Sequence, residues 1–180
     1  MTSATAKPKV CNPLTLGIAA AIGALAADQG SKLALLYGFG FAANPETRVP
    51  VTAFFDLVMV WNHGISYGLF QADGWMGTLA LTVFSLAAMA ALGWWLLRAE
   101  RAILGLGLGL IIGGAIGNVI DRVRYGAVAD FFYFHALGRG WYVFNIADAA
   151  ITIGVLALLA DAFSASDEAG PTREPDNRNE

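Results

Sequence analysis

The sequence predicts an all-α membrane protein with four transmembrane helices. Of its 180 residues, 57% are hydrophobic and 14% are charged, and the mean hydropathy is positive. This composition is typical of an integral membrane protein rather than of a water-soluble domain. Four apolar runs, each close to the ~20 residues that cross a hydrocarbon core, are separated by polar or aromatic segments. We therefore expect a single integral membrane domain over residues 1–163.

The first helix is expected over about residues 10–28. Its apolar run follows a polar start that carries Lys7 and Lys9. A secretory signal peptide has the same arrangement, and Ala24-Leu25-Ala26 would offer a cleavage site. However, the run is longer than the usual core of a signal peptide, and other spans of similar length follow it. These lengths favour an uncleaved first helix.

The later elements are read from breaks in hydrophobicity. Glycines and prolines interrupt residues 38–70, which contain a predicted strand at Phe55–Trp61. The turn at residues 98–101 is short, so the helices on either side are expected to be antiparallel. The tail 164–180 is rich in Asp, Glu, Pro and Asn and is expected to be disordered in the cytoplasm. The three further helices are expected over about residues 75–97, 102–120 and 145–163.

Four spans place both termini on one face of the membrane, and positive charge predicts the cytoplasmic face. The cations on that face are Lys7, Lys9, Arg98 and Arg101. Segments 38–70 and 122–143 are then extracytoplasmic. These segments and the adjoining helix ends also carry cations. This agrees with the positive-inside rule if several of the cations are paired within a site rather than exposed in loops. The topology brings six polar residues to this face: Asp28, Asn62, Asp121, Asp130, Asn145 and Asp148.

Two aromatic, strand-prone segments precede the last helix. Residues 131–136 and 141–144 flank Leu137-Gly-Arg-Gly140, which is typical of a hairpin turn. If the turn is centred on Arg139, antiparallel pairing sets Asp130 opposite Asp148. The hairpin therefore predicts that these two carboxylates converge.

Two close carboxylates can share one proton, because both cannot ionise cheaply. The ionised partner can take a proton from water while the protonated partner hydrogen-bonds the carbonyl under attack. This chemistry hydrolyses a peptide without a metal or a covalent intermediate. The alternative is that Asp130 and Asp148 are two separate interfacial aspartates.

Glycines recur at every fourth position of the third helix and predict a stripe that lets another helix approach closely. A dinucleotide-binding loop would need a preceding strand and a solvated turn, and neither is predicted here. Asp121 and Arg122, at the end of this helix, fit either an interfacial charge pair or a site. The glycines are Gly105, Gly109, Gly113 and Gly117.

Other polar residues suggest weaker alternatives. Asp28 and Lys32, at positions i and i+4, fit a helical ion pair. Ser31 beside Lys32, or Ser66 with a lysine from elsewhere, would suggest a Ser-Lys nucleophile, but adjacent residues rarely face each other usefully. With one Cys and two His, soft metal ligands are few, so no metal is expected, and no basic block suggests nucleic acid.

Five sequence blocks cover most of the chain, from Asp28 to about Gly154. In chain order they are Asp28-Gln-Gly-Ser-Lys32, Asn62-His-Gly-Ile-Ser-Tyr-Gly68, Gly113-Gly-Ala-Ile-Gly-Asn-Val-Ile-Asp-Arg122, Val128-Ala-Asp-Phe131 and Phe144-Asn-Ile-Ala-Asp148. In their order and spacing the chain resembles the bacterial lipoprotein signal peptidases, or signal peptidase II, a family of integral-membrane aspartic proteases.

The resemblance implies four transmembrane helices with a small extracytoplasmic β-cradle, in the bacterial cytoplasmic (inner) membrane. The implied reaction removes the signal peptide of a prolipoprotein just before a diacylglyceryl-modified cysteine, without a cofactor. Matched position by position, Asp130 and Asp148 correspond to the catalytic pair, and Asp28 with Lys32 to a structural polar pair. The residues that correspond to the supporting or substrate-binding set are Asn62, Asn118, Asp121, Arg122 and Asn145.

The implied partners are diacylglyceryl-prolipoprotein substrates and the lipid bilayer, whereas the oligomeric state is not predicted. The rival hypothesis is a small proton-coupled transporter or relay protein that uses intramembrane aspartates. It predicts carboxylates spread through the depth of the membrane, whereas these gather at one face. A purely structural membrane subunit would leave the asparagine-rich set unexplained.

Overall fold

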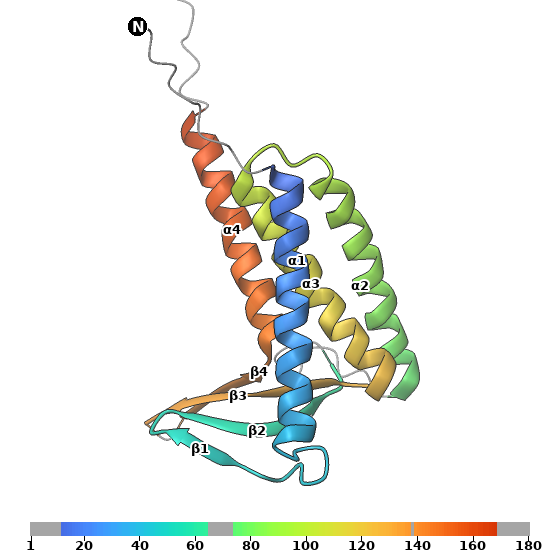
Figure 1. Cartoon of the computed structure of the whole chain (residues 1–180), viewed down its shortest axis with the longest axis vertical. Coiled ribbons are helices and arrows are strands. Elements are labelled where there is room, and N and C mark those ends of the chain that lie inside the picture. The colour runs from blue at the N-terminus through green and yellow to red at the C-terminus, as the bar shows by residue number, and fades with distance from the viewer. Residues whose placement is uncertain (1–11, 65–73, 138, 169–180) are drawn as a thin grey trace, which may run out of the picture.

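The computed structural model describes residues 12–64, 74–137 and 139–168, and in these it contains four long helices and a four-stranded antiparallel sheet (Figure 1). The helices form a bundle with the sheet at one end, while α1 begins and α4 ends at the other end (Figure 1). In chain order the elements are α1 (Pro13–Leu33), a π-helical turn η1 (Ala34–Gly38), β1 (Val49–Thr52), β2 (Phe55–Asn62), α2 (Gly74–Leu96), α3 (Ala102–Tyr125), β3 (Val128–Ala136), β4 (Arg139–Phe144) and α4 (Ile146–Glu168).

Three of the described helices are long and apolar enough to cross a membrane. α1 is not among them, and Asp28, Gln29 and Lys32 lie in its last third. The prediction of four helices is confirmed, but the described part of the chain gives only three of them the composition of a membrane span. The three spans are Trp75–Leu96, Ala102–Tyr125 and Ile146–Ser164.

Three helices run further than the sequence predicts. α1 continues past residue 28 to Leu33, because Asp28 and Lys32 are buried and paired inside the protein rather than ending the helix in water. α3 continues past residue 120 to Tyr125, where Gly126 caps it with a left-handed φ of 75°. α4 continues past residue 163 to Glu168, so the prediction of a disordered tail is wrong for residues 164–168, and the rest of that tail lies outside the described residues.

α3 packs against each of the other three helices, and its glycines explain how closely they approach. A Cβ added to Gly113 would overlap the backbone carbonyl of Ala21 on α1, as the predicted stripe requires. The neighbouring Gly114 faces the other way, and its Cβ would lie 2.5 Å from the carbonyl oxygen of Ala147 on α4. The predicted glycine stripe is confirmed, and it faces α1. A second close contact, at Gly114, lies against α4, and the four-residue spacing of the glycines did not predict it.

The sheet has the strand order β1-β2-β3-β4. The predicted strand at Phe55–Trp61 is confirmed as β2, whereas β1 was not predicted. The predicted hairpin register is wrong, because β3 ends at Ala136 and β4 already begins at Arg139. Tyr133 pairs with Val143, so paired residue numbers sum to 276 rather than 278, and the register shifts again before His135.

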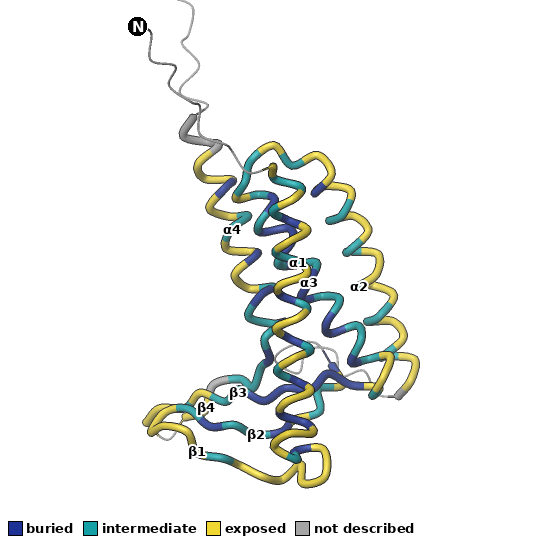
Figure 2. Tube along the Cα trace, viewed as in Figure 1, coloured by how far each residue is buried: buried dark blue, intermediate teal, exposed yellow. Residues whose placement is uncertain are grey.

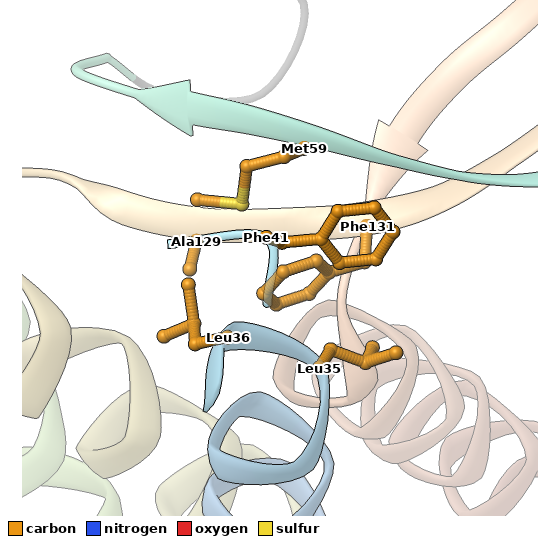
Figure 3. Packing of buried hydrophobic residues seen from close by; sticks show 6 residues of the cluster. All are labelled: Leu35, Leu36, Phe41, Met59, Ala129 and Phe131. Carbon is orange, nitrogen blue, oxygen red and sulfur yellow. The ribbon is translucent and has the colours of Figure 1, made fainter. Parts of the chain in front are cut away.

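A small hydrophobic core joins the end of α1 to the sheet. Leu36 and Phe41, from η1 and the segment after it, pack with Ala129 and Phe131 of β3, and Leu35 and Met59 complete the cluster (Figure 3). Successive side chains of a strand point to opposite faces, so Asp130 points away from this core, toward the helices. Buried residues gather along α3 and where β3 meets the bundle (Figure 2).

Candidate active site

Asn145 ties the two candidate aspartates together at the junction of sheet and bundle. Its side-chain amide donates to Asp130 Oδ1 at 2.6 Å, from the residue just before α4. Its side-chain oxygen accepts from the backbone N–H of Asp148 at 2.9 Å, and its own backbone N–H donates to Asp148 Oδ2 at 3.4 Å. This reciprocal pair is the geometry of a capping box, which begins α4 at this residue. Asp148 is therefore joined to Asp130 through Asn145, and it lies in the first turn of a helix rather than on an opposed strand.

Two further asparagines bond the remaining carboxylate oxygens. Asn62, at the end of β2, donates to Asp130 Oδ2 at 3.0 Å, and Asn118 of α3 donates to Asp148 Oδ1 at 2.9 Å. Asn62 also donates to the Tyr142 hydroxyl at 2.6 Å. Every oxygen of the two carboxylates thus accepts an N–H bond, which fixes the orientation of both groups.

Asp130 lies in β3, outside the helices, and only 1% of its surface is exposed. Burial, followed by the charge of Asp148, raises the pKa of Asp130 to about 7, against the opposing effects of Asn62, Asn145 and Lys32. A carboxyl with this pKa is about half protonated at neutral pH. The pair can therefore hold one proton where ordinary aspartates would hold none.

Lys32 forms a second, separate cluster behind the pair. Its Nζ lies 2.8 Å from Asp28 Oδ2 and 2.7 Å from Asp121 Oδ2, and all three side chains are almost fully buried. Asp28 also accepts from the Ala147 N–H at 3.0 Å, and Asp121 from the Ala129 N–H at 3.1 Å. Through these bonds the cluster joins α1 and α3 to β3 and α4. Asp121 belongs to it together with the predicted pair.

The two clusters meet at Asn118. Its side-chain oxygen accepts from Lys32 Nζ at 3.4 Å and from the Asn145 amide at 3.2 Å, while its amide donates to Asp148. Asn118 thus connects Lys32 directly to Asp148. It also connects Lys32 to Asp130, in this case through the side-chain amide of Asn145. The sequence did not predict this link, although it predicted each member. Gln29 donates to Asp28 at 3.1 Å and to Asp121 at 3.3 Å. The sequence did not identify it as a member of the polar cluster, although it lies between Asp28 and Lys32.

A cavity of about 260 Å³ opens beside Asp148. Its polar wall includes Asn62, Asn118 and Arg122, and Leu81, Phe84 and Ile151 form part of an apolar wall between α2 and α4. Arg122 donates to the carbonyl of Gly64 at 3.3 Å and so holds Gly64, which also lines the cavity. The cavity offers polar contacts beside one carboxylate and apolar contacts for side chains next to it.

The serine alternatives gain nothing from these contacts. The Ser31 hydroxyl donates to the Asp28 carbonyl at 2.8 Å, and Lys32 is held between two carboxylates. Ser66 lies outside the described residues. Within residues 12–64, 74–137 and 139–168, no group of three His, Cys, Asp or Glu side chains is placed to hold a metal ion.

Comparison with known proteins gives one consistent result. The sequence profile of the family described as "Signal peptidase (SPase) II" matches residues 20–164. Proteins named "Lipoprotein signal peptidase" from Rhodopseudomonas palustris (strain TIE-1) and Methylobacterium radiotolerans are 54% and 48% identical, over 84% and 89% of this chain and 93% and 95% of their own lengths. A solved structure titled "Bacterial membrane enzyme structure by the in meso method at 2.3 A resolution" superposes with a TM-score of 0.74 at 22% identity, covering 89% of this chain and 94% of that one. The last likeness concerns the fold alone.

Proposed function

The chain belongs to the signal peptidase II family, and we propose that Asp130 and Asp148 are the catalytic pair of an aspartic endopeptidase. Relatives that are 44–54% identical over most of the chain support removal of signal peptides from prolipoproteins as its reaction. The observation that carries the proposal is the capping residue Asn145, which bonds the carboxylates of both Asp130 and Asp148, and Asp148 lines the cavity.

In the proposed mechanism, the pair begins with one proton. Asp148, which lines the cavity, acts as the general base and takes a proton from the attacking water. Asp130, whose pKa is raised to about 7, holds the shared proton and donates it toward the carbonyl oxygen. When the tetrahedral intermediate collapses, the C–N bond breaks, the leaving amine takes the proton from Asp148, and a hydroxyl of the intermediate returns its proton to Asp130, so that the pair again holds one proton. Asn118, Asn62 and Asn145 keep the carboxylates in place through both steps.

We further propose that the scissile bond precedes a diacylglyceryl-modified cysteine. Such a residue stays at the membrane surface, and the aspartates lie where the apolar helices meet the sheet. Arg98 and Arg101, at the opposite end of the bundle, favour a cytoplasmic location for that end. The active site would then face the extracytoplasmic side of the bacterial inner membrane. Supporting roles for Asn62 and Arg122 follow from their place on the cavity wall.

The transporter alternative is not supported. The relatives are peptidases, and the aspartates of the two clusters gather at one end of the bundle rather than along it. A relay would need carboxylates in sequence through the membrane depth.

The proposal is tested by cleavage of a diacylated prolipoprotein with purified Asp130→Asn and Asp148→Asn variants. Each should lose roughly 10²–10⁴ in rate, the contribution of a general acid or base, and the double variant should be little worse than either single variant. The control is Asp56→Asn, which replaces another buried carboxylate of the sheet, away from the cavity. Turnover at the unaltered rate by a folded Asp148→Asn variant would refute the aspartic mechanism.

A further inference from the structure

Large apolar side chains are exposed at the outer end of the sheet, away from the aspartates. Phe54 is 56% exposed, Phe134 is 40% exposed and Leu137 is fully exposed. Leu137 also has a φ of 52°, in the left-handed region that favours Gly or Asn. Neither local conformation nor packing within the chain accounts for a leucine here. Contact with something apolar outside the chain would account for it.

Phe54 and Phe134 border a cavity of about 650 Å³ at the sheet end. The cavity is open and mainly apolar, and the cationic residue Arg139 is part of its lining. It is therefore shaped for a ligand that joins a hydrocarbon part to an anion. Its lining residues are Phe54, Phe134, His135, Ala136, Arg139 and Gly140.

An aromatic face leads from this cavity back toward Asp130. Phe132 and Phe134 follow Asp130 at two-residue steps along β3, so they share its face. Phe55 lies against both, with ring centroids 6.1 and 4.8 Å away, and Phe144 lies 5.9 Å from each. Because the Asp130 face is turned toward the apolar helices, this aromatic surface faces the interfacial layer of the bilayer that those helices cross.

The exposed charge of this sheet is positive. Its two carboxylates, Asp56 and Asp130, are 2% and 1% exposed. Asp56 is in addition paired with Arg48 and with His135, whose Nε2 lies 3.1 Å away. Within the described strands β1 to β4, the exposed formal charge is therefore that of Arg139. A cation beside exposed aromatic and aliphatic groups complements the phosphate and acyl chains of a phospholipid.

We propose that the outer end of the sheet binds a bilayer phospholipid. One acyl chain enters the cavity between Phe54 and Phe134, Leu137 enters the hydrocarbon boundary, and Arg139 pairs with the phosphate. The bound lipid holds the sheet at interfacial depth. Asp130 lies on the same strand, so its depth would be set with it. Lipid binding at this end of the sheet does not depend on the peptidase mechanism.

The depth of the tip is tested in nanodiscs of phosphatidylglycerol and phosphatidylcholine. Cys11, the only cysteine of the chain, is replaced by serine, and a fluorophore is attached to Leu137→Cys. A phosphatidylcholine spin-labelled near its headgroup should quench this probe strongly. The matched control is Thr47→Cys, an exposed position in the loop before β1. This loop lies on the side of the sheet away from the bundle (Figure 1). Equal quenching at both positions would overturn the proposal, as would spontaneous disulfide dimers through Leu137→Cys, which would identify a second copy as the occupant.

The phosphate contact is tested by retention of phosphatidylglycerol in native mass spectrometry of the full chain. Arg139→Gln should weaken retention roughly fivefold, from the ~1 kcal/mol that one cation contributes near an anionic surface. Arg124→Gln, an exposed cation outside the cavity, should leave retention unchanged. Leu137→Asn suits the left-handed backbone, so it should fold normally yet lose quenching-detected insertion of a probe at Ala136→Cys. Retention that is unaffected by Arg139→Gln would overturn the assignment of Arg139 to the phosphate.

Discussion

Asp130→Asn should make the protein more stable as the pH rises, relative to the unaltered chain. The folded pKa of Asp130 is raised from 3.8 to about 7, so the folded state binds more protons than the unfolded state between these values. Its stability therefore falls as the pH rises through this window. The full shift corresponds to about 4 kcal/mol at high pH, of which about 2.5 kcal/mol develops between pH 5 and pH 8. The asparagine variant does not titrate and escapes this loss.

The measurement is the difference in Tm between variant and unaltered protein in detergent. For a chain of this length, about 2.5 kcal/mol corresponds to a change of roughly 5–10 °C in that difference between pH 5 and pH 8. Any pH-independent cost of rearranging the Asn62 and Asn145 amides cancels in this comparison. Asp56→Asn is the control, because Arg48 and His135 outweigh burial and hold the pKa of Asp56 below its usual value, so it is ionised at both pH values. A Tm difference for Asp130→Asn that stays constant with pH would refute the raised pKa.

Two further substitutions separate structural from catalytic roles. Lys32→Met leaves Asp28 and Asp121 as buried charges without their cation. We expect a loss of about 3–5 kcal/mol in the free energy of unfolding, measured as a much lower Tm. An unchanged Tm would contradict the structural role of Lys32. Arg122→Lys keeps the charge but loses the planar guanidinium that donates to the Gly64 carbonyl, so cleavage of the diacylated substrate should fall with little change in Tm, whereas full activity would show that charge alone suffices.

The convergence of Asp130 and Asp148 was predictable, but the geometric reason given for it was wrong. Glycines at positions 138 and 140 suggested a turn centred on Arg139, whereas Leu137 takes the left-handed conformation and the turn lies earlier. Local sequence cannot reveal that a leucine adopts a backbone conformation typical of glycine. The two carboxylates are brought together because Asn145 caps α4 and bonds both of them, and such an arrangement follows from tertiary packing.

The same limit applies to the buried ion pair. The spacing of Asp28 and Lys32 predicted their contact, because positions i and i+4 are neighbours on a helix. Asp121 is distant in sequence, and its contact with Lys32 depends on how closely α1 approaches α3. The glycine spacing predicted this close approach but not which polar groups it would bring together. Periodicity predicts which face of a helix is buried. Which residues pair across two packed helices also depends on how far one helix is shifted along its axis relative to the other, and periodicity does not give this shift.

Gly117 belongs to the glycine stripe and also contacts the buried polar cluster of Asp28, Lys32 and Asp121. A Cβ added there would overlap Oδ2 of Asp28, the oxygen that pairs with Lys32. Gly117→Ala should therefore displace a buried carboxylate and lower the unfolding free energy by about 1–3 kcal/mol, the usual cost of overpacking.

The matched control for this change is Gly23→Ala, in the interior of α1. A Cβ there meets nothing within 4 Å, so the substitution should leave stability unchanged or raise it by about 0.5–1 kcal/mol, through the higher helix propensity of alanine. Because Asp28 also accepts from the N–H of Ala147, next to Asp148, Gly117→Ala should slow cleavage even where the protein remains folded. Equal melting temperatures and equal cleavage rates for the two alanine variants would show that the stripe only packs helices and does not position the site.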